Sequence, residues 1–312
     1  MAYRTFAFAA VALFALGASH ASATAQRTFV ASSGNDANPC TLVSPCRGFA
    51  AALVQTSGKG EIVVLDSAGY GPVSITQSVS IIAPPGVYAG ISVLSYGNGV
   101  AVFGTGLKVV LRGLTINTFA GGFGVRVVSG SNDSEVLVEA CEISNFDYAI
   151  LVEAAATVTV IDTVVRNNFY GIHVKDGATV TVARSSILQN QDEGIMIYGS
   201  APPALPSSIV VTDSVVAGRG PGYAANCIAN NVSPVGGGSG NISVTRSTVT
   251  DCQSGIFVES GAAGTVTISN SMITRNLYGF TNSSGTFLSL GNNHVSGNMT
   301  DTTGTITTVP PL

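Results

Sequence analysis

Two similar segments near the middle of the chain carry side chains that could hold or process a sugar. The first reads Gly-Ile-His-Val-Lys and contains His173 and Lys175, and the second reads Gly-Ile-Met-Ile-Tyr and ends at Tyr198. A Lys, His or Tyr side chain can remove a proton next to a carboxylate when its pKa is suitably tuned. We therefore take His173, Lys175 and Tyr198 as candidate catalytic residues.

Aromatic and acidic side chains lie close to these segments, or at matching positions of the same repeat. Aromatic rings beside polar groups suit sugars, because the axial hydrogens of a sugar ring pack on a π surface. We take five of these side chains as candidate substrate-binding residues: Glu153, Tyr170, Asp192, Glu193 and Phe257. The alternative is that the rings stack for stability and that the charges only solvate the surface.

The two segments belong to a repeat that covers most of the chain. Five stretches align with each other: 136–153, 158–175, 180–198, 242–259 and 266–283. Each contains a strand with alternating apolar residues, a small residue, an apolar residue, a turn with Asn or Asp, and then Gly-Ile-x-Val or a close variant. Alternation with period 2 predicts short β-strands that have one face inside and one outside.

Strands this short cannot bury a core alone, and the repeat has no helix that could build βαβ units. Stacking each coil on the previous one pairs the backbone groups and makes continuous apolar columns. The sequence therefore predicts an all-β fold, a single right-handed parallel β-helix of about 9–10 coils over residues 60–308. The alternative, an antiparallel sandwich, requires hairpin turns of the Asn-Gly type, which are scarce here.

Most polar positions of the repeat have a structural interpretation. One column follows the first strand of each coil and should form an outward ladder of opposite charges: Asp162, Arg184, Asp213 and Arg246. Another column lies four residues before the Gly-Ile-x-Val segments and should form an asparagine ladder in the turns: Asn145, Asn167, Asn190 and Asp251. On the outer face, Glu153 is expected to stack on Lys175.

Three insertions interrupt the repeat in neighbouring coils, at residues 201–207, 218–223 and 233–240. Insertions in solenoids often gather on one side and wall a binding face. Because these segments are rich in Pro and Gly, tolerated slack is the alternative.

The ends of the chain predict export and a capped solenoid. Residues 1–25 read as a signal peptide, with Arg4, an apolar run and a cleavage site before Gln26. Residues 26–59 should hold a strand, a Cys loop and a capping helix from Arg47 to Thr56. Residues 309–312 form a tail. We expect a protein secreted to the periplasm or the extracellular space, without a membrane span.

Five cysteines in an exported chain raise the question of disulfides. Cys40 and Cys46 enclose a short loop and are expected to pair, since two Cys without a nearby His make a poor zinc site. Cys141 stands where the repeat demands a small buried residue. Cys227 and Cys252 fall in neighbouring coils but in different columns, so their pairing stays open.

The coils and the helix in front of them resemble the pectin-lyase-like right-handed parallel β-helix superfamily, over about residues 45–308. The stretches 34–49 and 60–71 are similar to those of exported bacterial β-helix repeat proteins without assigned activity. The resemblance implies the fold and leaves the chemistry open. The Gly-His-Gly motif of polygalacturonases and the Arg-x-Pro-x-x-Arg motif of pectate lyases are missing.

Composition narrows the partners. The formal net charge is −4 and no basic patch is present, which argues against nucleic acid. Only His173 and His294 follow the signal peptide, so neither a histidine-rich metal site nor a cofactor is expected. Ca²⁺ held by carboxylates such as Asp147, Asp192 or Glu193 is an open alternative. The sequence does not indicate an oligomeric state.

We expect an exported scaffold that binds polysaccharide or cell-surface glycan, because the repeat is regular and no catalytic signature matches. The alternative is a polysaccharide-processing enzyme (a lyase, epimerase or glycoside hydrolase) that acts on the outer face of the Gly-Ile-x-Val strands. A self-assembling structural protein is a third hypothesis, based on the low charge and the Thr-rich end.

Overall fold

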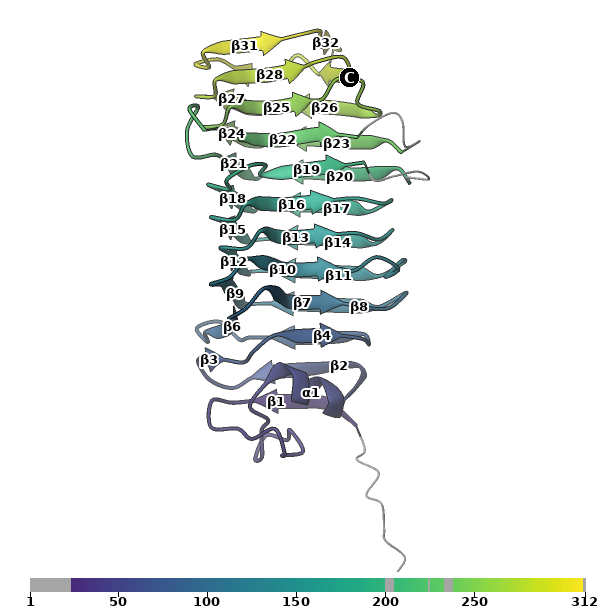
Figure 1. Cartoon of the computed structure of the whole chain (residues 1–312), viewed down its shortest axis with the longest axis vertical. Helices are drawn as coiled ribbons and strands as arrows, with labels where there is room; N and C mark the ends of the chain where they lie inside the picture. The colour runs from purple at the N-terminus through teal and green to yellow at the C-terminus, as the bar shows by residue number, and fades with distance from the viewer. Residues whose placement is uncertain (1–23, 200–204, 224, 233–237, 311–312) are drawn as a thin grey trace, which may run out of the picture.

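The computed structural model describes residues 24–199, 205–223, 225–232 and 238–310 (Figure 1). Nearly all of the predicted signal peptide, most of the insertion at 233–240 and part of the insertion at 201–207 lie outside these ranges.

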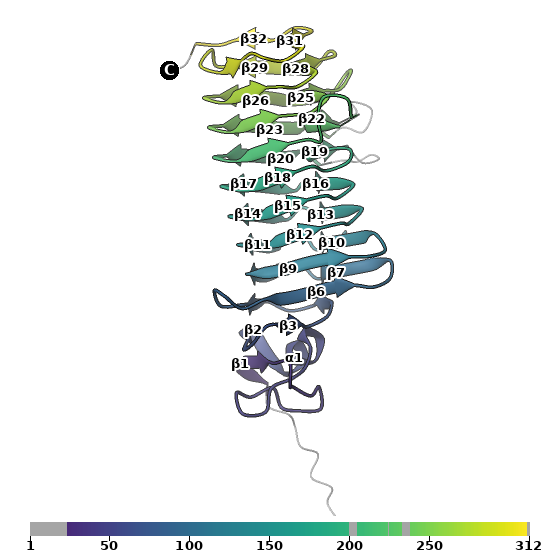
Figure 2. The same cartoon turned by 90° about the vertical axis from the view of Figure 1, so that its left-hand side faces the viewer.

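The described chain forms one elongated solenoid in which three parallel sheets run along the long axis (Figures 1 and 2). Sheet A has twelve strands among the described residues, and sheets B and C have ten each. Each coil crosses sheet C, then sheet A, then sheet B, and every strand pairs in parallel with the same strand of the next coil. The predicted β-helix and its number of coils are therefore confirmed.

The strands of the three sheets have the following bounds. Sheet A contains β1 (Ala25–Val30), β2 (Thr56–Val64), β5 (Val79–Ile82), β8 (Lys108–Arg112), β11 (Glu135–Glu139), β14 (Thr157–Ile161), β17 (Thr179–Ala183), β20 (Ser207–Thr212), β23 (Gly240–Thr245), β26 (Thr265–Ser269), β29 (Thr286–Ser289) and β32 (Thr307–Thr308). Sheet B contains β3 (Ala68–Gly69), β6 (Ala89–Val93), β9 (Leu114–Thr118), β12 (Glu142–Ser144), β15 (Val164–Arg166), β18 (Ser186–Leu188), β21 (Val215–Ala217), β24 (Thr248–Thr250), β27 (Met272–Thr274) and β30 (His294–Val295). Sheet C contains β4 (Val73–Ile75), β7 (Gly97–Val102), β10 (Gly122–Val127), β13 (Tyr148–Val152), β16 (Tyr170–Val174), β19 (Ile195–Tyr198), β22 (Asn226–Asn231), β25 (Ser254–Val258), β28 (Tyr278–Asn282) and β31 (Thr300–Thr303).

The core is made of inward β-branched columns, as the alternation in the sequence predicts. In sheet A, Val136 lies beside Val158 and then Val180 on successive strands, and all three are buried. Full burial of one such side chain contributes about 1.5–3 kcal/mol. Their regular stacking therefore accounts for much of the stability of each coil.

The N-terminal end of the solenoid is covered by α1 (Phe49–Gln55), the one helix in the described part of the chain (Figure 1). Phe49 and Ala52 on its inner face are fully buried in the common core. The helix thus shields the apolar end of the first coil, and β1 adds a further strand to sheet A in front of β2. The predicted disulfide between Cys40 and Cys46 is present next to this cap, with the two Cα atoms 4.6 Å apart.

The charged column forms separate ion pairs. Arg184 binds Asp162 at 2.8 Å and Arg246 binds Asp213 at 2.7 Å. No ion pair joins Arg184 to Asp213 within the described chain, so the expected ladder consists of two pairs. These four residues have positive φ angles of 46–51°, which places them at a left-handed corner between sheets A and B.

The asparagine ladder is offset by one residue from the predicted column. Asn145, Asn167 and Asp251 occupy left-handed turn positions, with φ of 71°, 58° and 61°. The stacked amides belong to the following residue of the turn, where Asn168 donates to Asn190 at 3.0 Å. Asn190 therefore belongs to this buried column, and the predicted alignment was wrong there because its turn is one residue longer.

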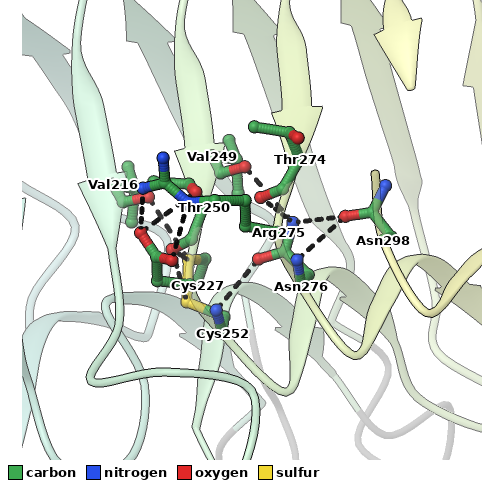
Figure 3. The surroundings of a disulfide bond; sticks show 10 residues. Val216, Cys227, Val249, Thr250, Cys252, Thr274, Arg275, Asn276 and Asn298 are labelled. Atoms are coloured by element: carbon green, nitrogen blue, oxygen red, sulfur yellow. Dashed lines mark hydrogen bonds and ion pairs between the residues drawn. A yellow bond between two sulfur atoms is a disulfide. The ribbon is translucent and has the colours of Figure 1, made fainter. Parts of the chain in front are cut away.

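A second pair of ladder residues, Asn276 and Asn298, is joined in the same way at 3.0 Å (Figure 3). Between the two pairs, the amide nitrogen of Asn190 has no hydrogen-bond partner among the described residues. The next coil has the insertion at 218–223 in this corner. The insertion thus interrupts the ladder between sheets B and C.

Cys227 and Cys252 form a disulfide at this interruption, with Cα atoms 5.7 Å apart (Figure 3). Cys227 takes the position that Gly255 has in the next strand of sheet C, and the backbone N–H of Cys252 donates to Asn276 as a ladder residue does. In the adjacent coil, a Cβ atom on Gly255 would lie 3.0 Å from the amide nitrogen of Asn276. The two positions are therefore neighbours across coils, although they belong to different columns.

Candidate functional site

The candidate residues lie on the outer face of sheet C, at mid-height of the solenoid (Figure 1). Strands β13, β16 and β19 are adjacent, and Leu151, His173 and Met196 lie side by side on them. Lys175 directly follows β16, and Tyr198 is the last residue of β19. We call the outward side chains of these three strands, with the residues directly flanking them, the sheet C strip.

His173 is the centre of the strip and is surrounded by tyrosines. Its ring centroid lies 5.4 Å from that of Tyr148, 5.5 Å from that of Tyr170 and 5.6 Å from that of Tyr198. The residue is only 5% exposed, and neither ring nitrogen has a hydrogen-bond partner in the part of the chain that the structure describes. Burial, together with the nearby charge of Lys175, lowers the pKa of His173 to about 3. The imidazole is therefore neutral at physiological pH.

Lys175 and Tyr198 form the open side of the strip. The Lys175 ammonium lies 5.7 Å from the centroid of the Tyr198 ring, in a cation–π arrangement. Tyr198 is 47% exposed. The three candidate catalytic residues are thus brought together, but only Lys175 and Tyr198 are accessible from solvent.

Glu153 lies beside Lys175 in the column as expected, because Val152 pairs with Val174, but no ion pair joins the two within the described chain. Its carboxylate binds Arg126, which lies on the preceding strand β10, at 2.7 Å. The pair is mostly buried, with side-chain exposures of 29% and 18%. The charge of Glu153 is therefore compensated by Arg126, and no ion-pair partner of Lys175 is found among the described residues.

Tyr170 belongs to a stack of rings that runs along the solenoid axis. The centroids of Phe123 and Tyr148 are 5.5 Å apart, those of Tyr148 and Tyr170 are 4.8 Å apart, and both pairs are nearly parallel. Stacking occupies the faces that these rings turn toward each other, and the Tyr170 hydroxyl is hydrogen-bonded to Asp192. Burial and the nearby carboxylates raise the pKa of Tyr170 to about 12, so its hydroxyl remains a hydrogen-bond donor.

Glu193 occupies the position after Tyr170 in the aromatic column. The backbone N–H of Gly171 donates to the backbone carbonyl of Glu193 at 2.9 Å. Its side chain is almost fully buried. Burial and the adjacent Asp192 raise the pKa of Glu193 to about 7, so its carboxyl holds a proton for part of the time at neutral pH. Sequence reasoning placed both acids at this site but missed the protonation of Glu193, because it depends on burial.

Phe257 is not part of the strip. It lies in the same column as His173, but Met196 and Ala229 occupy the strands between them. At about 4.8 Å per strand, the separation along the axis is about 14 Å. The insertion at 218–223 lies at the corner that leads to β22, one strand beyond β19.

No group of three or more His, Cys, Asp or Glu side chains that could hold a metal ion is found among the described residues. The Asp147 carboxylate accepts a hydrogen bond from the backbone of Gly122 at 3.0 Å. A Ca²⁺ site at Asp147, Asp192 or Glu193 therefore gains no support from the donor set. None of the described helices is long and apolar enough to cross a membrane.

Comparison with protein families identifies the fold. The family model described as right handed beta helix region matches residues 98–299, about two thirds of the chain. The chain belongs to this right-handed β-helix family. No curated protein sequence matches the β-helix.

Solved structures similar to this β-helix include pectate lyase Pel9A, which has a TM-score of 0.69 at 16% identity and is matched over 91% of this chain and 79% of its own. The Dettilon tailspike protein has a TM-score of 0.40 at 11% identity, over 80% of this chain and 55% of its own. A rhamnogalacturonan lyase has a TM-score of 0.41 at 13% identity, over 80% of this chain and 76% of its own. The likeness to Pel9A concerns the fold alone. This fold agrees with the resemblance to the pectin-lyase-like superfamily.

Proposed function

We propose that this β-helix is an exported protein that binds a polysaccharide or cell-surface glycan through the sheet C strip. The observation that carries the proposal is the convergence of tyrosines and Lys175 around His173, whose ring nitrogens have no partner among the described residues, with the Asp192–Glu193 pair beside Tyr170. Tyrosine hydroxyls and an ammonium group supply the donors that sugar hydroxyls require. Pel9A, named as a pectate lyase, agrees with a polysaccharide ligand.

The strip favours an uncharged glycan over an acidic one. Among the residues that the structure describes, Lys175 is the one cation at its open side, since Arg126 is paired with Glu153. Asp192 and Glu193 lie at the opposite side and would repel the carboxylate of a uronic acid. Tyr198 is a ring on which a sugar can stack, because it is about half exposed, whereas the faces of Tyr148 and Tyr170 contact each other.

The two disulfides support export. Cys40–Cys46 and Cys227–Cys252 are bonds of the kind that persist in oxidising compartments such as the periplasm and the extracellular space. The intact mass of the protein recovered from culture medium or periplasm should correspond to a chain that begins at Gln26 or Thr24. Recovery of the uncleaved chain would contradict export through a cleaved signal peptide.

A glycan array probed with the purified protein tests the binding proposal. The triple variant Tyr170→Ala, Lys175→Ala and Tyr198→Ala should lose binding to the hits, while Tyr278→Ala, in the same column as Tyr170 but at the far end of sheet C, should retain it. His173 is left intact because removal of this buried ring would leave a cavity among the tyrosines of the strip. Unchanged binding by the triple variant would exclude this face.

A second candidate function is glycan cleavage, which the raised pKa of Glu193 favours. A carboxyl that carries a proton near neutral pH can act as a general acid. Incubation of each array hit with the protein, followed by mass spectrometry of the sugar, distinguishes the two functions. An enzyme should release shorter products and lose this activity in Glu193→Gln with binding retained, whereas a binding protein should leave the glycan intact.

A further inference from the structure

The outer face of sheet A has an open hollow of about 520 Å³ at strands β8, β11 and β14. Two outward columns line it: Lys108, Glu135 and Thr157 lie side by side on the three strands, and so do Val110, Leu137 and Thr159. We call these six residues the sheet A cavity. It is open to solvent, and it is on a different sheet from the sheet C strip.

The sheet A cavity combines an apolar floor with hydrogen-bonding groups. Val110 and Leu137 are neighbours on adjacent strands, about 4.8 Å apart, and both are partly exposed although they are apolar. Thr157 and Thr159 add two hydroxyl groups on the next strand. The Lys108 ammonium and the Glu135 carboxylate bind each other at 3.0 Å and supply donors and acceptors at one side.

The charges of this region are compensated locally. Lys108 is paired with Glu135, and at the other edge of the same strands Arg112 is paired with Glu139 at 2.7 Å. A polyanion such as nucleic acid requires several cations that are free to bind phosphates. The region therefore suits a ligand without net charge.

A peptide cannot bind here by adding a strand. Strands β8, β11 and β14 are each hydrogen-bonded on both sides within sheet A, whereas strand addition requires an exposed edge. The remaining chemistry is that of a ring with an apolar face and hydroxyl groups around its rim. An uncharged sugar has this chemistry.

We propose that the sheet A cavity is a second glycan-binding site, which holds a short stretch of uncharged oligosaccharide independently of the sheet C strip. The C–H face of one sugar ring packs on Val110 and Leu137. Its hydroxyls bond to Thr157 and Thr159 and to the Lys108–Glu135 pair. Ligands held on two sheets would give the protein avidity for a polymer that offers both attachment points.

Titration calorimetry with four uncharged hexasaccharides (cellohexaose, xylohexaose, mannohexaose and maltohexaose) tests this site. Thr159→Phe fills the cavity and should weaken binding of at least one sugar by about tenfold or more, or remove one site from the stoichiometry. Thr267→Phe makes the same change in the same column on β26 and should bind as the wild type does. The double variant Lys108→Ala and Glu135→Ala should weaken binding in the same way, and circular dichroism verifies that each variant is folded.

The outcomes separate this site from the sheet C strip. Loss in Thr159→Phe, with binding retained by the triple variant of Tyr170, Lys175 and Tyr198, supports the sheet A cavity. Equal affinity and stoichiometry of the wild type and Thr159→Phe overturns the proposal, as does the absence of binding by the wild type to all four sugars. If the triple variant alone abolishes all binding, the sheet C strip stands and the sheet A cavity is excluded.

Discussion

His173 is held on the outer side of sheet C as a neutral aromatic ring rather than as a solvated base. In the unfolded chain its pKa is about 6.5, whereas burial beside Lys175 lowers the pKa to about 3 in the folded chain. Between these values the unfolded state binds a proton that the folded state does not bind. The contribution of His173 to stability is therefore present above about pH 6.5 and is lost as the pH falls toward about 3.

Replacing His173 should reduce the acid sensitivity of the fold. A pKa difference of one unit corresponds to about 1.4 kcal/mol, so the effect amounts to a few kcal/mol at most. We expect the loss of unfolding free energy between about pH 7 and about pH 4 to be smaller in His173→Leu than in the wild type, as measured by urea unfolding. In the wild type, NMR should show a neutral His173 ring at about pH 5, and a normal titration near pH 6.5 would contradict the burial argument.

The Arg184–Asp162 pair predicts an asymmetry between two substitutions. Arg184→Ala removes one exposed pair, while Arg184→Asp places a carboxylate between Asp162 and Asp213 of the neighbouring coils. We expect a lower Tm for Arg184→Asp than for Arg184→Ala at low salt, and a smaller difference at high salt, because ions screen exposed charges. Equal Tm values at low salt would mean that position 184 is not close to both aspartates.

At the scale of the strands and corners, the repeat was predictable and its exact register at one corner was not. Alternating Val and Ile define the inward columns without ambiguity, because a shift by one residue would turn them outward. The corner before Gly-Ile-x-Val has no such constraint, since both Asn167 and Asn168 are Asn. The amide that stacks is the buried one, and burial follows from the three-dimensional path of the turn.

The corrected ladder predicts different effects for two adjacent asparagines. Asn168 is buried, accepts from the backbone of Phe146 and donates to Asn190 at 3.0 Å. Asn168→Ala should cost about 1–3 kcal/mol, because it leaves buried backbone groups without partners. Asn167→Gly should be close to neutral, since Gly suits a φ of 58°. Chemical unfolding of both variants checks the order, and a reversed order would restore the original alignment.

The Cys227–Cys252 pair takes the place of a glycine and an asparagine, and this exchange can be tested directly. The double variant Cys227→Gly and Cys252→Asn should restore the Gly–Asn contact seen at Gly255 and Asn276. We expect it to be more stable than Cys227→Ser with Cys252→Ser, by about 1 kcal/mol for each regained hydrogen bond. Both should be less stable than the disulfide form. Thermal unfolding of the three proteins tests this order of stability. Equal Tm values for the two double variants would contradict it.

At the scale of the whole molecule, each coil contacts mainly its neighbours, so stability is approximately a sum along the axis. Phe49 is fully buried under the N-terminal cap, while Val54 on the same helix is 73% exposed. Phe49→Ala should cost about 3–5 kcal/mol and should raise amide exchange in β2 and β5 more than in β25 and β28. Val54→Ala serves as the matched control and should leave exchange unchanged. Equal loss of protection along the whole solenoid would indicate all-or-none unfolding.

The candidate site shows the same division between what the sequence predicts and what it leaves out. Column alignment brought His173, Lys175 and Tyr198 together, because strands of a solenoid stack in register. It did not show that His173 is closed over by tyrosines or that Glu153 turns to Arg126. Phe257 was included because its column was right, although two strands lie between it and His173 along the axis. Burial and side-chain direction decide these points, and neither is encoded by period alone.

β14 and β17 pair in register from Thr157 and Thr179 onward. Each coil therefore adds the same length to the solenoid. Insertion of one more copy of residues 157–178 would keep every inward column and the three corners of the coil in phase. It would lengthen the molecule by about 4.8 Å. The distance between the capped end and the coils beyond the insertion is therefore adjustable by duplication of coils, without a change in the outward side chains of those coils.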